Sequence, residues 1–79
     1  MLEFRKEAWD RGVCHYYEDE RVEIAINKYK IVPIDMTEDD FHILISIDGV
    51  LKHNEIKPFG SWEDAEKYAD FWAKELAHE

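Results

Sequence analysis

Two histidines and one glutamate are the residues whose types and spacing could support metal chemistry. If Asp48-Gly49 forms a two-residue hairpin turn, His42 lies opposite Glu55 on the returning strand and His53 lies opposite Leu44. All three polar side chains then share one face of the hairpin, within diagonal reach of one another. Two imidazoles and a carboxylate can bind a metal ion or form a pH-sensitive contact. An exposed polar trio without a ligand explains the pattern more simply, so we predict no metal site.

Cys14 and His15 are the second pair that could do chemistry. Because adjacent residues on a strand point to opposite faces, they cannot form a dyad with each other. Another histidine could approach Cys14 in space, but a buried structural cysteine is the simpler interpretation. The sequence contains no glycine-rich phosphate-binding motif, no paired-histidine zinc motif and no nucleophile-elbow motif. We therefore predict a non-catalytic protein that has no catalytic residues, no metal and no cofactor.

Phe71 and Trp72 are adjacent aromatic residues in SWEDAEKYADFWAKEL, residues 61–76, which is predicted to be a helix. Neighbours on a helix lie about 100° apart, so one apolar stripe cannot easily hold both rings. The predicted stripe consists of Trp62, Ala65, Ala69, Trp72 and Leu76. Phe71 lies about 140° from the centre of this stripe. We therefore predict that Trp72 enters the core and that Phe71 stands on the outer face.

An exposed phenylalanine surrounded by charged side chains is typical of a protein-binding surface. Tyr68 is expected at the edge of the apolar stripe, and Asp64, Lys67 and Glu75 surround Phe71 on the helix. These five residues form the predicted binding site for another protein or for a second copy of the chain. Two alternatives stay open, because the N-terminal segment could cover Phe71 or the ring could be an idle surface aromatic.

Acidic residues dominate the charge of the chain. Its 19 Asp and Glu against 10 Lys and Arg give a net charge of −9. Such a surface repels phosphate backbones and anionic lipids, so we predict neither direct nucleic-acid binding nor membrane binding. Two acidic clusters could instead imitate the phosphates of DNA if they share one face. They are Glu18, Asp19 and Glu20, and Glu38, Asp39 and Asp40.

Length and composition predict a single domain, residues 1–79, located in the cytoplasm. Hydrophobic residues make up 46% of the 79 residues, which suffices for a thin core in a chain of this length. One cysteine excludes an internal disulfide. No apolar run is long enough for a transmembrane helix, and the first residues lack the apolar stretch of a signal peptide.

The middle of the chain is predicted to form strands that position these residues. Strict alternation over residues 41–48 predicts a half-buried strand, and residues 50–56 are predicted to be its hairpin partner. Residues 22–26 alternate in the same way. Residues 29–32 continue in the opposite phase, which indicates a tight turn or a bulge between the two segments.

The two ends of the chain complete the expected fold. Residues 13–17 are a candidate short strand, and Ser61 is the expected N-cap of the C-terminal helix. Residues 2–11 alternate like a strand but contain good helix formers, so we slightly favour a short N-terminal helix. The predicted class is α+β, an antiparallel sheet of three to five strands with a C-terminal helix packed on one face.

The segment IKPFGSWEDAEKYADFWAKEL, residues 56–76, resembles the final strand, turn and helix of many three-strand-plus-helix domains. The arm-type DNA-binding domains of phage integrases are among them. Basic residues on the strands are scarce in this chain, which departs from those domains where DNA would bind, so DNA binding is not carried over.

The predicted function is protein–protein interaction or self-association through the C-terminal helix. The alternative function is an acidic DNA-mimic inhibitor of a nucleic-acid-binding protein, of a phage or mobile-element type. An ordinary solvated acidic surface explains the clusters without that function.

Overall fold

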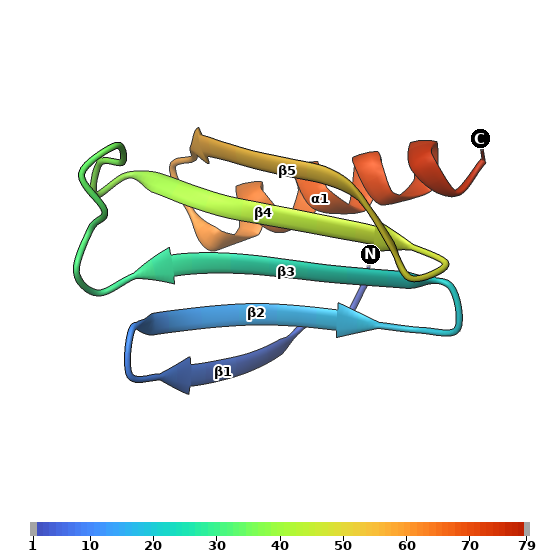
Figure 1. Ribbon diagram of the computed structural model, residues 1–79, viewed down its shortest axis with the longest axis horizontal. Coiled ribbons are helices and arrows are strands. Elements are labelled where there is room, and N and C mark those ends of the chain that lie inside the picture. The colour runs from blue at the N-terminus through green and yellow to red at the C-terminus, as the bar shows by residue number, and fades with distance from the viewer. Residues whose placement is uncertain (1, 79) are drawn as a thin grey trace.

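The computed structural model of the protein describes residues 2–78, which form one sheet and one helix (Figure 1). The elements in chain order are β1 (Arg5–Trp9), β2 (Gly12–Glu18), β3 (Val22–Tyr29), β4 (Asp40–Ile47), β5 (Val50–Pro58) and α1 (Trp62–Ala77). Each strand pairs antiparallel with the next, so the sheet order is β1-β2-β3-β4-β5. This confirms the predicted α+β class, with an antiparallel sheet and a C-terminal helix packed against one face.

The N-terminal segment is a strand, and the slight preference for a helix was wrong. β1 pairs with β2 from Arg5 opposite Tyr16 to Trp9 opposite Gly12, and only Asp10 and Arg11 connect the two strands. Cross-strand pairing outweighs the helix propensity of these residues, because propensity is a weak term beside tertiary context. All five side chains of β1 are exposed.

Residues 30–39 form a loop between β3 and β4, so of the strand predicted at residues 29–32 only Tyr29 lies in a strand, and residues 30–32 were predicted wrongly. Ile31 and Ile34 are 86% and 105% exposed. The loop turns back on itself, because the amide of Met36 donates to the carbonyl of Pro33 at 2.9 Å. A proline in this position cannot donate to a strand ladder, which favours the turn.

The hairpin of β4 and β5 has the predicted two-residue turn and an unpredicted bulge. Asp48 and Gly49 have φ angles of 52° and 80°, as the preferred hairpin turn requires. Beyond the turn, Ser46 pairs with Leu51 but Ile45 pairs with His53, so one residue of β5 is extra. The remainder of β5 is therefore shifted by one position, and its side chains exchange faces relative to a regular register.

The core lies between α1 and the two central strands. The alternating isoleucines of β3 and β4 are almost completely buried, as predicted, and α1 supplies small side chains opposite them. The buried apolar residues are Ile24, Ile26, Phe41, Ile43, Ile45, Ile47, Ala65, Ala69 and Ala73. Fully burying one such isoleucine contributes roughly 1.5–3 kcal/mol.

The helix begins at the predicted position, but the face that it buries is rotated slightly from the predicted apolar stripe. The hydroxyl of Ser61 accepts a hydrogen bond from the amide of Asp64 at 3.2 Å, which caps the N-terminus. The buried centre is the alanine stripe, whereas Trp62 and Trp72 are only partly buried against the core. Alanines allow the helix to approach the isoleucines closely. Trp62 packs on Phe41 and stacks on His15 at the start of the helix, and Trp72 stacks on His53 of β5.

The opposite side of the sheet is uncovered. In Figure 1, α1 lies behind β4 and β5, and no other element of residues 2–78 crosses the front. We call this side the open face. The alternation of the strands places on β2 to β5 of this face Cys14, Tyr16, Glu18, Glu23, Ala25, Asn27, His42, Leu44, Ser46, Leu51, Asn54 and Ile56.

Candidate interaction surfaces

Phe71 stands on the outside of α1, as the helical periodicity predicts. Its side chain is 55% exposed, and it lies about 160° around the helix from the centre of the alanine stripe. Its only ring contact among the described residues is an edge-to-face contact with Trp72, at 5.6 Å between centroids and 84° between planes. Within residues 2–78, the N-terminal segment does not cover this ring.

Three of the four charged or polar neighbours predicted for Phe71 are also exposed. Asp64, Lys67 and Glu75 lie on the outer turns of the helix. Lys67 pairs with Glu63 at 3.0 Å, and this hydrogen-bonded contact raises the pKa of Lys67. We call Phe71, Asp64, Lys67 and Glu75 the outer helix surface.

Tyr68, the fourth neighbour, belongs to a different group of side chains. It is half-buried, and its hydroxyl donates a hydrogen bond to the carboxylate of Glu55 on β5. This contact is the main cause of both a raised pKa of Tyr68 and a lowered pKa of Glu55. The phenol is therefore engaged inside the protein and is not part of the outer helix surface.

His53 completes this group, which we call the β5 edge cluster: His53, Glu55, Tyr68 and Trp72. The imidazole stacks on Trp72 at 5.6 Å, with 23° between the ring planes, and its Nε2 lies 3.3 Å from Glu55 Oε1. Sequence reasoning placed His53 and Glu55 together but missed the two helical aromatics. Their spacing of four residues, which puts both on one helix face, was the available signal.

His42 does not join His53 and Glu55, so the predicted face-sharing trio was wrong. His42 lies on the open face, where Nδ1 contacts the hydroxyl of Tyr29 at 2.8 Å and Nε2 contacts Asn54 Oδ1 at 2.7 Å. The bulge is the physical reason, because it turns His53 and Glu55 toward α1. Among residues 2–78, no three His, Cys, Asp or Glu side chains are grouped to hold a metal ion.

Cys14 and His15 point to opposite sides of β2, as expected. Cys14 is half-buried on the open face, and its pKa is raised mainly by burial, with the charge of Glu7 adding to the effect. A raised pKa disfavours the reactive thiolate. His15 is buried on the other side, where its Nδ1 lies 2.6 Å from Glu66 Oε2 and its ring stacks on Trp62 at 3.7 Å.

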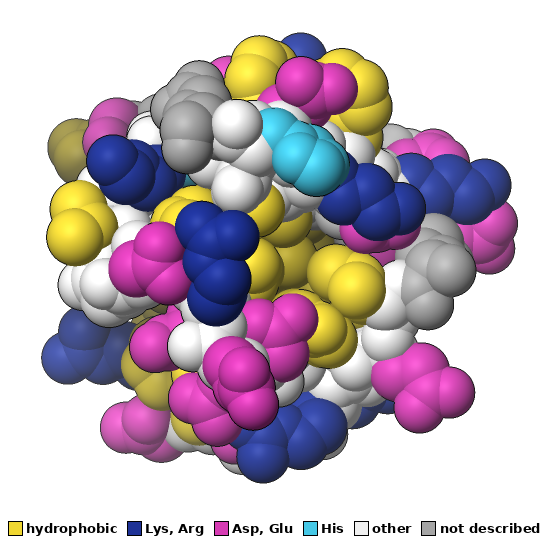
Figure 2. Space-filling model, turned by 90° about the vertical axis from the view of Figure 1, so that its right-hand side faces the viewer, with side chains coloured by type: hydrophobic (Ala, Val, Ile, Leu, Met, Phe, Trp, Pro, Cys, Tyr) yellow, Lys and Arg dark blue, Asp and Glu magenta, His cyan; other side chains and the backbone are white. Residues whose placement is uncertain are grey.

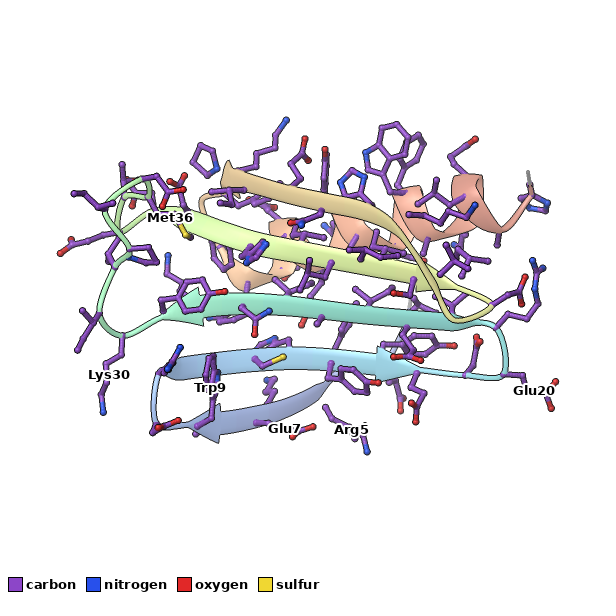
Figure 3. The ribbon with its side chains drawn as sticks, viewed as in Figure 1. Arg5, Glu7, Trp9, Glu20, Lys30 and Met36 are labelled. Atoms are coloured by element: carbon purple, nitrogen blue, oxygen red, sulfur yellow. The ribbon has the colours of Figure 1, made fainter. Side chains whose placement is uncertain are left out.

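The two acidic clusters lie at opposite ends of the sheet. Residues 18–20 lead into the turn between β2 and β3, whereas residues 38–40 lie at the end of the β3–β4 loop and the start of β4. Glu20 and Met36 mark the two ends in Figure 3. Asp19 and Asp40 also stabilise the local backbone. Asp19 accepts a hydrogen bond from the amide of Val22 and Asp40 accepts one from the amide of Thr37, both at 2.8 Å. The structure therefore does not bring the clusters into one row of carboxylates.

The end of the molecule with the β2–β3 turn combines acidic groups with an apolar hollow. Figure 2 shows apolar side chains at the centre of this end, bordered by acidic and basic ones. A hollow of about 300 Å³ here includes Ile47, Val50 and Leu76 in its lining. Arg21 closes one side by a bidentate contact with Asp48, with both distances 3.1 Å. This ion pair links the β2–β3 turn to the β4–β5 turn, so its role is structural.

On the open face, we expect the phenol of Tyr16 to remain mostly protonated near pH 11. Partial burial and hydrogen bonds to Glu18 and Glu23 raise its pKa from 10.0 to about 12, whereas an unperturbed tyrosine is about 90% ionised at that pH. Because the unfolded chain loses this proton first, Tyr16 stabilises the fold fully below pH 10, and the effect is lost as pH rises toward 12. Carbon-13 NMR of labelled tyrosine rings measures this pKa. A value near 10 would contradict the two hydrogen bonds.

These features define an α+β protein with two uncovered surfaces, the outer helix surface and the open face. Comparison of the chain with family models, with curated proteins and with solved structures finds no match in any of the three. The helix in residues 2–78 is too short and too polar to cross a membrane.

Proposed function

We propose that this chain is a non-catalytic protein–protein interaction module that binds another protein, or a second copy of itself, through the outer helix surface. The observation that carries the proposal is the 55% exposure of Phe71 on a helix whose opposite stripe is fully buried. Burying a phenylalanine contributes roughly 1.5–3 kcal/mol, so a partner gains most of its affinity at this ring. The surrounding charges fix the orientation of the partner.

The proposed test is Phe71→Asp, which removes the ring and adds a charge at the centre of the surface. We expect partner capture from a host lysate, or self-association of the purified chain in sedimentation, to weaken roughly ten-fold or more. Ile34→Asp is the matched control, because Ile34 is exposed in the β3–β4 loop and is not part of the outer helix surface. If the folded Phe71→Asp variant keeps both its mass in solution and its captured partner, the proposal fails.

Salt dependence separates this function from the acidic DNA-mimic alternative. Binding through an apolar ring changes little with ionic strength, whereas binding through rows of carboxylates weakens steeply. The separation of residues 18–20 from residues 38–40 removes the support that one shared acidic face would give to the alternative. The interaction module is therefore the better supported function.

A further inference from the structure

The centre of the open face lacks charge, although the chain is highly charged. Two neighbouring rows of residues cross β2 to β5, one from Cys14 to Ile56 and one from Tyr16 to Asn54. Neither row contains Asp, Glu, Lys or Arg, whereas these residues make up 37% of the sequence. Depletion of charge and enrichment of aromatic residues are typical of the buried centre of a protein interface.

Apolar side chains are exposed around this uncharged centre. Leu51 is 52% exposed, Ile56 41% and Trp9 40%. The principal extents of the molecule are 34 × 22 × 21 Å, so a rectangle of 34 × 22 Å covers about 750 Å². A standard protein interface buries about 800 Å² on each partner, so a partner of standard size covers most of this side of the molecule.

Two glutamates at one margin of the open face lack a cationic partner. Glu18 and Glu23 are directly opposite each other on β2 and β3, and both accept a hydrogen bond from the hydroxyl of Tyr16, at 3.0 and 3.3 Å. Within residues 2–78, neither carboxylate makes an ion pair. Arg5 lies 5.0 Å from the Tyr16 ring centroid, and it pairs with Glu7 along β1 at 4.0 Å (Figure 3). Like charges directly opposite across two strands destabilise a sheet.

We propose that the open face is a docking surface for a second protein that presents apolar side chains beside an arginine. The apolar side chains cover Leu44, Leu51 and Ile56, and the guanidinium lies between Glu18 and Glu23. A planar guanidinium has enough donors for two carboxylates and can also stack on an aromatic ring. A second copy of this chain fits less well, because it carries a net charge of −9.

This surface is distinct from the outer helix surface. Phe71 is exposed on a helix whose opposite stripe is buried against the sheet. In Figure 1 this helix lies behind the sheet, whereas the open face is the side turned to the viewer. A partner on one surface therefore leaves the other accessible. Loss of binding in Phe71→Asp and loss of binding at the open face are separate results.

The experiment titrates the isotope-labelled full chain with a capped hexapeptide of alternating arginine and leucine. We expect saturable NMR shifts of the methyl groups of Ala25, Leu44 and Leu51. In Glu18→Gln/Glu23→Gln the affinity is expected to fall about five-fold. This variant should melt at the same or a higher temperature, because it removes a like-charge pair. Asp35→Asn/Glu38→Gln makes the same charge change in the β3–β4 loop and should bind normally, as should Phe71→Asp.

Several results would overturn the docking proposal. They are the absence of saturable shifts at millimolar peptide, shifts centred on α1, and equal binding of a peptide with serine in place of leucine. Equal binding by the Glu18→Gln/Glu23→Gln variant would do the same. Open-face shifts that grow with protein concentration in the absence of peptide would assign the face to a second copy instead.

Discussion

Replacing Ile26 by alanine is expected to lower the free energy of unfolding by about 3 kcal/mol. Ile26 is completely buried on β3, with Ile43 opposite it on β4 and α1 packed over both strands. The truncation leaves a cavity between layers that have little freedom to close around it. A chain of this size has a total stability of roughly 4–12 kcal/mol, so a large share is lost. Urea unfolding followed by circular dichroism measures the change.

Ile34→Ala is the matched control for this measurement. Ile34 is 105% exposed in the β3–β4 loop, so the same chemical change there should alter stability by less than about 0.5 kcal/mol. Equal effects at the two positions would show that Ile26 does not lie between the sheet and the helix.

Gly12→Ala is expected to have a comparable effect, of about 3 kcal/mol, for a steric reason. A Cβ atom at Gly12 would lie 2.0 Å from the carbonyl oxygen of Lys28 on the neighbouring strand. The obstacle is backbone, so no rotation of a side chain can relieve it, and β2 must move away from β3. Thermal unfolding and the amide spectrum of β2 and β3 report the change.

Gly60→Ala is the control for Gly12→Ala. Its added Cβ would lie 3.6 Å from Asp64 Oδ2, which is an ordinary contact, and the backbone there is not left-handed. We expect a stability change within about 0.5 kcal/mol. A tolerated Gly12→Ala would contradict the close approach of β2 to β3.

Local patterns were sufficient to predict the parts of the fold that depend on nearest neighbours. The alternation from Phe41 to Ile47 reflects one covered face and one uncovered face of β4. Asp48-Gly49 has the backbone preferences that a two-residue hairpin turn demands, and Ser61 has the hydroxyl that an N-cap uses. The exposure of Phe71 follows from helical periodicity in the same way.

The errors concern features that depend on contacts distant in the sequence. The extra residue in β5 has no signature in its own side chains, yet it decides that His53 faces Trp72 instead of His42. Likewise, β1 is a strand because β2 is beside it, and periodicity alone could not rank the alanines above Trp72 as the centre of the helix contact. In the group around Tyr68, the spacing of the two helical aromatics is visible in the sequence, but their contact with Glu55 is not, because Glu55 faces α1 only through the bulge.

The sequential order of the strands has a consequence for how the chain acquires its structure during synthesis. Each strand pairs with the one made just before it, so every hairpin can close without waiting for a distant segment, and such local connectivity favours rapid folding. The helix that covers the isoleucines follows all five strands in the chain. The isoleucine face of the sheet therefore stays exposed to solvent during synthesis until α1 leaves the ribosome. We expect chaperones to bind the nascent chain mainly in that interval.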